Sequence, residues 1–297
     1  MTTPNYLSKG DKIGIVSTAR KITESEIAPC ISRLESWGLE VVLGDNLFKK
    51  ENQFAGSDQD RVRDMQSMIN DASVKAIICA RGGYGTVRIV DTVDYSQLTT
   101  SPKWLIGFSD VTVMHSHIHA NFGLATLHGP MAINFGDSES LEELKKALFG
   151  EELVYAFSSQ KLNRRGTCEG DIIGGNLSLL YSLMASNSQM DTRGKILFLE
   201  DLDEHLYHID RMMQNLNRAG YLEHLSGLLI GGMTNMNDND IAFGATCEEI
   251  IAETVSDYDY PVAYGFSAGH MKKNLPLILG AQVELVVEDS GSNLRFL

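Results

Sequence analysis

Residues 12–43 read KIGIVSTARKITESEIAPCISRLESWGLEVVL, and their pattern decides the fold class. The apolar run 12–17 predicts a buried strand. Thr23, with a glutamate three residues later, has the spacing of a capping box and predicts the start of a helix. Apolar side chains then repeat at helical spacing until Gly38, which ends the helix, and residues 39–43 predict a second strand. The segment is therefore a strand, a helix and a strand in succession.

The same cycle recurs further along the chain. Ser57 precedes a predicted helix, residues 75–80 (KAIICA) predict a third strand, and residues 104–108 (WLIGF) predict a fourth. A helix is expected over residues 110–121. Short apolar strands separated by amphipathic helices are typical of a parallel sheet with helices on both faces, so we expect an α/β fold.

This rhythm breaks between residues 150 and 166, in a polar stretch that contains SSQKLNRRG. We therefore predict an N-terminal α/β domain over residues 1–150, a linker over 151–165 and a C-terminal domain over 166–297. In the second domain, strands are expected near 172, 195–200, 228–230, 261–265 and 282–287, and helices near Asn176, His208 and Thr246.

Composition limits the classes of function. The 297 residues include 43% hydrophobic residues and carry a formal net charge of −14, so a large basic surface for nucleic acid or anionic lipid is not expected. The N-terminus lacks the pattern of a signal peptide, and no apolar run reaches the ~18 residues of a membrane span, so we expect a cytoplasmic protein. The four cysteines lie far apart, which argues against disulfides and a zinc ribbon.

Ser109 stands where the predicted strand 104–108 ends and a helix begins. Such a junction exposes the hydroxyl, and the first N–H groups of the helix point to where an oxyanion would form. The serine nucleophile of a G-x-S-x-G turn is one interpretation. The alternative is that Ser109 or Asp110 simply caps the helix, because Val111 stands where the second glycine of that motif would be.

A glycine-rich segment, ARGGYG at residues 80–85, directly follows the third predicted strand. Loops at this end of a parallel sheet bind ligands, and glycines let backbone amides approach a substrate closely. If Ser109 is a nucleophile, this loop is well placed to supply a second donor to the oxyanion. The segment does not match G-x-G-x-x-G, so a dinucleotide site is not favoured, and a tight turn without function remains open.

A serine nucleophile needs a base, and eight histidines compete for that role. His115, His117 and His119 lie on one predicted helix, where 115 and 119 share a face and 117 points elsewhere. That geometry cannot bring all three to one metal, so we predict no metal site and expect histidines of the helix surface or core. His128 is either structural or lines a cleft. Three further histidines, at 205, 208 and 224, are expected to face solvent.

His270 follows a strand-like run in the loop FSAGHMKKN, a position typical of catalytic bases. The strongly apolar strand KILFL delivers Glu200 and Asp201 at its end. A carboxylate there is costly unless it is paired or hydrogen-bonded, which hints at a function, although a structural hydrogen bond explains it equally well. Glu204 is the alternative partner of the base if the strand ends later.

Seven blocks in this order carry a resemblance to a known family: GDKIGIVSTAR, ARGGYG, LIGFSDVT, LHGPM, IIGGNLSLL, ILFLED and GHMKKNLPLILGAQVEL. Over nearly its whole length the chain resembles the murein L,D-carboxypeptidases, the serine peptidases of family S66. The resemblance implies a triad of Ser109, Glu200 and His270, with the backbone N–H groups of Gly83 and Asp110 as the oxyanion hole. It also implies a flavodoxin-like N-terminal layer, a C-terminal domain with a small sheet or barrel, no cofactor, a homodimer, and hydrolysis of the bond to the terminal D-alanine of murein tetrapeptides.

Two alternatives accompany this assignment. The family also contains microcin C immunity proteins, which cleave peptidyl- or aminoacyl-adenylate substrates. A non-catalytic module that binds a wall peptide or nucleotide is the second alternative. One departure from the family pattern is Phe108, which stands where many relatives carry tyrosine.

Overall fold

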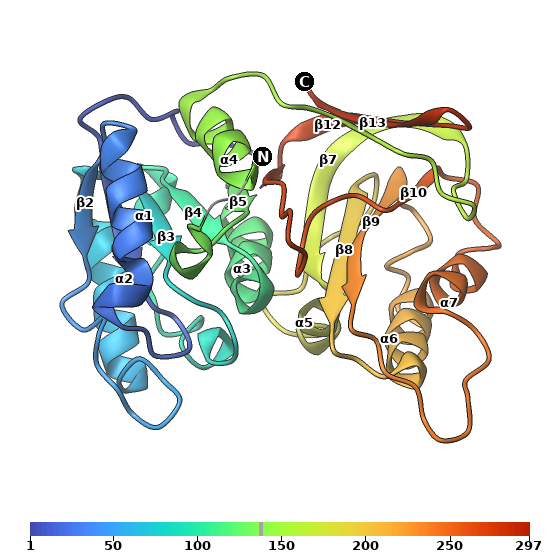
Figure 1. The fold of residues 1–297 in the computed structure, drawn as a ribbon, viewed down its shortest axis with the longest axis horizontal. Helices are drawn as coiled ribbons and strands as arrows, with labels where there is room; N and C mark the ends of the chain where they lie inside the picture. The colour runs from blue at the N-terminus through green and yellow to red at the C-terminus, as the bar shows by residue number, and fades with distance from the viewer. Residues whose placement is uncertain (137–138) are drawn as a thin grey trace.

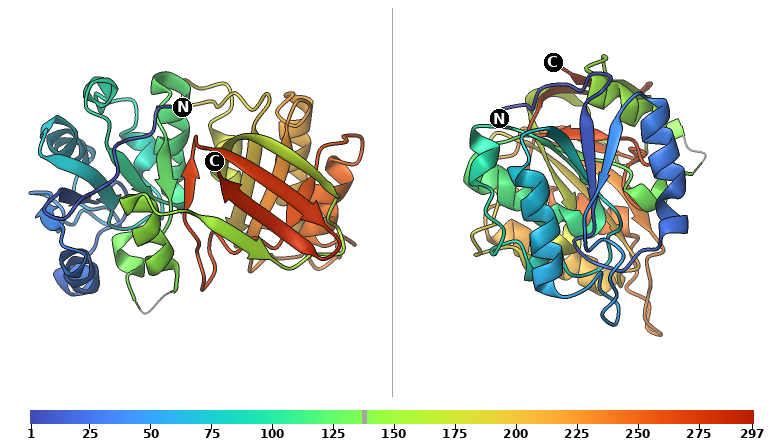
Figure 2. Two further views of the ribbon diagram at one scale, coloured as in Figure 1. Left: turned by 90° about the horizontal axis from the view of Figure 1, so that it is seen from above. Right: turned by 90° about the vertical axis from the view of Figure 1, so that its left-hand side faces the viewer.

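The protein is an α/β protein with two sheets, and the computed structural model describes residues 1–136 and 139–297 (Figures 1 and 2). The N-terminal sheet is mostly parallel and the C-terminal sheet is mixed, so the predicted fold class is confirmed. The two sheets with their helices lie side by side in Figure 1. Within the described ranges, no helix has the length and apolar character needed to cross a membrane.

The first sheet has six strands in the order β11-β5-β4-β3-β1-β2. Their bounds are β1 Lys12–Val16, β2 Glu40–Leu43, β3 Val74–Cys79, β4 Trp104–Gly107, β5 Thr126–His128 and β11 Leu277–Leu279. All neighbours are parallel except β11, which runs antiparallel to β5. The order β2-β1-β3-β4-β5 is that of flavodoxin-like sheets, in which ligands bind where the strand order reverses, between β1 and β3.

Helices cover both faces of this sheet, as the right-hand view of Figure 2 shows for the first two. The buried side chains of α1 (Glu24–Ser36) and α4 (Glu139–Phe149) join one apolar core, and those of α2 (Asp58–Asn70) and α3 (Thr112–Phe122) join another. The predicted capping box is present at the start of α1, and Ser57 forms a further one at the start of α2. Four short 3-10 helices complete this half: Thr86–Arg88, Ser96–Thr99, Ser109–Val111 and Ala132–Asn134.

The second sheet has seven strands in the order β10-β9-β8-β7-β12-β13-β6. Their bounds are β6 Val154–Phe157, β7 Gly166–Asn176, β8 Ile196–Leu202, β9 Gly227–Thr234, β10 Val262–Tyr264, β12 Gln282–Glu288 and β13 Gly291–Phe296. Strands β7 to β10 are parallel, whereas β12, β13 and β6 pair antiparallel. Three helices, α5 (Leu177–Ser182), α6 (Leu206–Arg218) and α7 (Cys247–Thr254), pack on one face of β7 to β10.

Four strands, β5, β6, β11 and β13, lie where sequence patterns did not place them, and two of these change the expected organisation. The segment 151–165, predicted to be a linker, contains β6, which pairs with β13 at the edge of the second sheet. Strand β11 belongs by sequence to the second half, yet it adds to the first sheet beside β5. The chain therefore crosses between the two halves more than once, and residues 277–279 complete the sheet that the N-terminal residues begin.

Candidate active site

Ser109 lies at the turn between β4 and α3, as the sequence predicted. Its backbone is left-handed, with φ of +61°, a conformation that costs a non-glycine residue ~1–2 kcal/mol. A strand-to-helix turn of this kind lifts the side chain clear of the sheet edge. The helix predicted over 110–121 begins as a 3-10 turn over Ser109–Val111 and becomes α-helical at Thr112.

His270 reaches the serine from the second half of the chain. Its Nε2 atom lies 2.9 Å from Ser109 Oγ, and the ring of Phe108 packs on the imidazole with centroids 5.0 Å apart. Two hydrogen bonds hold the loop that carries His270. Within the loop, Gly269 N donates to Asn274 Oδ1 at 2.7 Å, and from β9, Thr234 Oγ1 donates to the His270 carbonyl at 3.1 Å. The imidazole is therefore fixed in position on its loop.

Glu200 contacts the other side of the same imidazole. It lies on β8 and is fully buried, and its Oε2 atom is 2.7 Å from His270 Nδ1 and accepts a second hydrogen bond from His270 N at 3.2 Å. Gly269 makes this approach possible, because its φ is +102° and a Cβ there would lie 2.5 Å from Glu200 Oε2. Glu204, the alternative partner, lies instead 2.5 Å from His208 Nδ1. The geometry thus joins Ser109, His270 and Glu200 in one chain of hydrogen bonds.

The charge of Glu200 controls the titration of its neighbours. Burial would lower the pKa of His270, but the hydrogen bond and the charge of Glu200, with a contribution from Asp201, outweigh burial and raise the pKa of His270. Burial, followed by the charge of Glu200, raises the pKa of Asp201 to about 6, against the hydrogen bonds that its carboxylate accepts. Those bonds come from Leu202 N at 2.8 Å, Asn176 Nδ2 at 2.9 Å and Ser178 N at 2.8 Å. Asp201 therefore holds the start of α5, whereas Glu200 faces the histidine.

The glycine-rich loop lies directly against the serine. A Cβ on Gly82 would be 3.4 Å from Ser109 Cβ, and Gly83 has φ of +112°. In the described chain, the Gly83 amide N–H has no protein acceptor. The Asp110 side chain is buried and its Oδ2 accepts a hydrogen bond from Thr86 N at 2.9 Å, so it ties the loop to the start of α3. Burial raises the pKa of Asp110, against these hydrogen bonds.

Arg61, on α2, holds this loop in place, a role that sequence patterns did not reveal. It lies on α2 and is 1% exposed, and its Nη1 donates to the carbonyl of Gly85 at 3.0 Å and to that of Thr18 at 2.5 Å. It also pairs with Asp58. A charged residue on an amphipathic helix is normally expected to face solvent, so nothing in the local pattern indicated a buried clamp.

The two halves approach closely next to the serine. Asn176 N donates to Thr112 Oγ1, on the helix that follows Ser109, at 3.1 Å. Gly175 has φ of +140°, and a Cβ there would lie 2.6 Å from Thr112 Oγ1. The glycine pair in the IIGGN block thus permits the close contact of β7 with α3, and no sequence signal distinguished this from a simple turn.

The remaining histidines lie apart from this constellation. His115, His117 and His119 are buried and bond to the Gly107 carbonyl, Ser188 Oγ and Thr126 Oγ1, respectively. The sequence left open whether these histidines lie on the helix surface or in the core, and the structure places them in the core. His128 is fully buried and its Nε2 lies 3.2 Å from Asn274 Oδ1, so it supports the His270 loop from below. Among the described residues, no group of three His, Cys, Asp or Glu side chains has the placement of a metal site.

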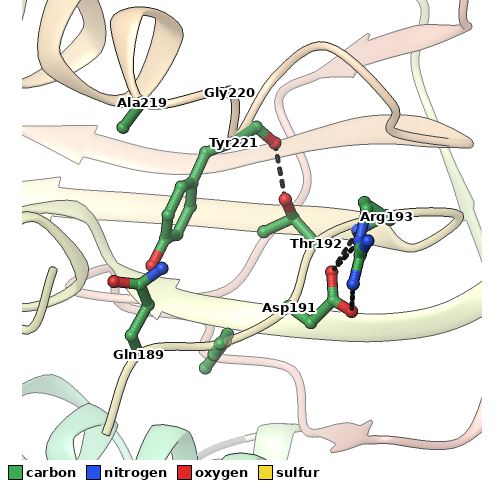
Figure 3. Close-up of a pocket in the computed structure, with 8 residues that line it drawn as sticks. Gln189, Asp191, Thr192, Arg193, Ala219, Gly220 and Tyr221 are labelled. Atoms are coloured by element: carbon green, nitrogen blue, oxygen red, sulfur yellow. Dashed lines mark hydrogen bonds and ion pairs between the residues drawn. The ribbon is translucent and has the colours of Figure 1, made fainter. Parts of the chain in front are cut away.

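Two cavities have linings that contain none of Ser109, His270 and Glu200. One of about 410 Å³ adjoins the His270 loop and is lined by Thr234, Tyr264 and Met271 among others. Another of about 360 Å³ is drawn in Figure 3 and is lined by residues 189–193 and 219–221, none of which belongs to the hydrogen-bonded chain. In this second cavity, Arg193 forms an ion pair with Asp191 at 2.7 Å, so these two charges neutralise each other.

A serine, a histidine and a buried carboxylate bonded in this order are the arrangement found in serine hydrolases. Comparison with known proteins defines the class further. Residues 13–129 match the LD-carboxypeptidase N-terminal domain and residues 169–285 the LD-carboxypeptidase C-terminal domain. The chain belongs to the LD-carboxypeptidase family, peptidase family S66.

Individual relatives agree with this assignment. The chain is 35% identical to the probable murein peptide carboxypeptidase of Bacillus subtilis, over 95% of this chain and 91% of the relative. The crystal structure of muramoyltetrapeptide carboxypeptidase from Oxalobacter formigenes superimposes with a TM-score of 0.88 at 28% identity, covering 96% of this chain and 98% of that one. The microcin C7 self-immunity protein MccF, in complex with aspartyl sulfamoyl adenosine, shares the fold, with a TM-score of 0.85 at 22% identity and 98% coverage of both chains.

Proposed function

We propose that the protein is a serine-type L,D-carboxypeptidase that hydrolyses the bond to the terminal D-alanine of murein tetrapeptides, for wall recycling. The observation that carries the proposal is the hydrogen-bonded chain Ser109–His270–Glu200, with spacings of 2.9 and 2.7 Å, in a member of the LD-carboxypeptidase family. The names of the relatives support murein peptide as the substrate class.

In the proposed mechanism His270 is the general base. Its Nε2 takes the proton of Ser109 as Oγ bonds to the carbonyl carbon of the L-D peptide bond, and the carbonyl electrons move to the oxygen. When the C–N bond breaks, His270 gives this proton to the amine of D-alanine. Water then attacks the ester, passes a proton to His270, and the serine is restored when the shortened peptide leaves as a carboxylic acid.

Glu200 and the backbone assist this chemistry in different ways. The Glu200 carboxylate accepts the Nδ1–H of His270, which fixes the tautomer with Nε2 facing the serine and stabilises the imidazolium. The N–H groups of Gly83 and Asp110 are the proposed donors to the oxyanion, each contributing ~3 kcal/mol in comparable sites. The left-handed turn at Ser109 presents Oγ to His270 Nε2, 2.9 Å away.

The test is release of D-alanine. Purified murein tetrapeptide is incubated with the protein and the products are followed by mass spectrometry, with Ser109→Ala as the inactive variant and Ser36→Ala, on the exposed end of α1, as the matched control. We expect release by the wild type and by Ser36→Ala only. Absence of release by wild type, or equal release by Ser109→Ala, would show the proposal to be wrong. Faster cleavage of an aminoacyl-sulfamoyl adenosine would favour the adenylate substrate instead.

The resemblance also supports proposals on organisation. We propose a homodimer in the cytoplasm, with domains at 1–150 and 166–297; the segment 151–165 between them adds β6 to the second sheet, and β11 returns to the first. Sedimentation at micromolar concentration tests the homodimer, since a dimer has twice the mass of one chain. A species with the mass of a single chain at all concentrations contradicts it.

A further inference from the structure

We propose that Arg20 binds the terminal carboxylate of the substrate and thereby restricts the enzyme to the last peptide bond. This inference rests on the proposed function, because it concerns the same site. It assigns a specificity-determining residue outside the hydrogen-bonded chain of Ser109, His270 and Glu200.

The topology brings Arg20 to the correct edge of the first sheet. Strands β1, β3 and β4 are neighbours and parallel, so the segments that follow them meet at one edge. Arg20 follows β1, the glycine-rich loop follows β3, and Ser109 follows β4. The strand order reverses between β1 and β3, which is where open α/β sheets bind their ligands.

The Arg20 side chain extends across the glycine-rich loop. A Cβ on Gly83 would lie 2.5 Å from Arg20 Cδ and 2.6 Å from its Nε, and a Cβ on the adjacent Gly82 would lie 3.4 Å from Ser109 Cβ. Of these two consecutive glycines, Gly82 therefore contacts the serine and Gly83 contacts the arginine stem. The missing side chain of Gly83 leaves the space that the stem occupies, so the arginine side chain lies against the loop that follows β3.

Arg20 differs from the other arginines around this loop because its charge is not paired. Arg61 and Arg88 both bind Asp58, and Arg81 lies 3.4 Å from Glu26. Within the described residues, the exposed Arg20 side chain makes no hydrogen bond or ion pair. Its backbone, by contrast, is fixed, since Ser17 Oγ donates to the Arg20 carbonyl at 2.7 Å. A fixed residue therefore presents a free cation beside the nucleophile.

The chemistry of the free guanidinium matches a carboxylate. Its planar set of N–H donors binds both oxygens of a carboxylate at once, and such charge-assisted bonds are stronger than neutral ones. In a chain of net charge −14, an anionic peptide needs a local cation to approach. The terminal carboxylate of a carboxypeptidase substrate lies one residue, about 3.8 Å, beyond the scissile bond. A longer peptide would place a neutral amide there instead.

The experiment compares two peptides that differ only at the terminus. The kcat/KM is measured for a murein tetrapeptide with a free terminal carboxylate and for the same peptide as the terminal amide. We expect the wild type to prefer the acid by about 10- to 100-fold, the range for a charge-assisted hydrogen bond. Arg20→Gln should lose this preference by slowing only on the acid, and Arg20→Lys should retain part of it. Arg81→Gln, in the neighbouring glycine-rich loop but paired with Glu26, is the matched control and should keep the wild-type ratio.

The outcomes separate this inference from the proposed function. An unchanged preference in Arg20→Gln, or an equal loss in Arg81→Gln, overturns the role of Arg20 while D-alanine release by wild type still supports the peptidase. If wild type cleaves neither peptide, the proposed function fails. Calorimetry on Ser109→Ala, with and without Arg20→Gln, then decides on Arg20 alone: tighter binding of the acid that disappears with Arg20→Gln supports it, and equal binding of both peptides overturns it.

Discussion

Replacing Glu200 by glutamine removes one charge from the site with almost no change in shape. Glu200 Oε2 faces both N–H groups of His270, while Oε1 is buried and has no partner among the described residues. If the glutamine oxygen takes the position of Oε2, a buried NH2 group is left unpaired, which costs ~1–3 kcal/mol. If the NH2 group takes it, the amide donates to Nδ1 and leaves the imidazole in the tautomer with Nε2–H, which cannot accept the serine proton.

The magnitude follows from these two orientations. Loss of a hydrogen bond to a charged group costs ~1.5–3 kcal/mol, which is a factor of about 10 to 150 in rate. Where the wrong tautomer dominates, as in the asparagine variant of the trypsin triad, the loss reaches about 10,000-fold. We therefore expect Glu200→Gln to lower kcat/KM by about 10- to 10,000-fold, with KM changed far less than kcat.

The pH profile gives a second readout for the same variant. His270 must be neutral to accept a proton, so kcat/KM falls as pH drops below its pKa. Glu200 raises the pKa of His270, and its removal lowers that pKa, so the acidic limb of the profile moves to lower pH in Glu200→Gln. The assay is D-alanine release between pH 4 and 9, with thermal unfolding to verify the fold.

Glu204→Gln is the matched control, since Glu204 contacts His208 and not His270. We expect it to keep wild-type kcat/KM within about threefold, as for a surface change. Activity of Glu200→Gln within threefold of wild type, an acidic limb that moves to higher pH, or a large loss in Glu204→Gln would each refute the role given to Glu200.

Three other changes are expected to have distinct effects. Gly269→Ala places a Cβ 2.5 Å from Glu200 Oε2 and should lower kcat at least ~10-fold. Gly194→Ala, also at positive φ but with no neighbour within 4 Å, is the control and should not alter kcat. Equal kcat in the two variants contradicts this expectation. Asp110→Ala frees Thr86 N and should destabilise the fold by ~1–3 kcal/mol in urea unfolding; an unchanged midpoint argues against the tether. The pKa of Asp201 is raised from its ordinary value of 3.8 to about 6 in the fold, so its contribution to stability is present below pH 3.8 and lost as pH rises through 6. Asp201→Asn should remove this dependence of the unfolding free energy on pH, and identical slopes for the two proteins in urea titrations at several pH values contradict it.

Much of the fold follows from local sequence patterns. The capping-box spacing at Thr23 and the buried apolar runs located β1, α1, β3 and β4 to within one or two residues, whereas β5 was not predicted. The edge strand β6 was missed because it is only four residues long with alternating exposure, which resembles a polar connection. Strand β11 is three residues long, and only tertiary contact with β5 makes it a strand.

For the site, the sequence indicated which residues could take part but not which of them are in contact. The positions of Ser109, Glu200 and His270 at strand ends pointed to chemistry, but their contact depends on pairing residues 70 to 161 positions apart, which no local pattern encodes. The choice between Glu200 and Glu204 depended on where β8 ends and which way each side chain points. The roles of Arg61 and Gly175 appear only once distant segments are packed together.

The central claim is that Ser109 is a nucleophile activated by His270, and covalent labelling tests it most directly. The protein is treated with a serine-reactive fluorophosphonate, and the intact mass and the modified peptide are determined by mass spectrometry. The account predicts one label for each chain, located on Ser109, with none on Ser109→Ala and a much slower rate for His270→Ala. Labelling that is absent, that falls on another residue, or that proceeds at the wild-type rate in His270→Ala would contradict it.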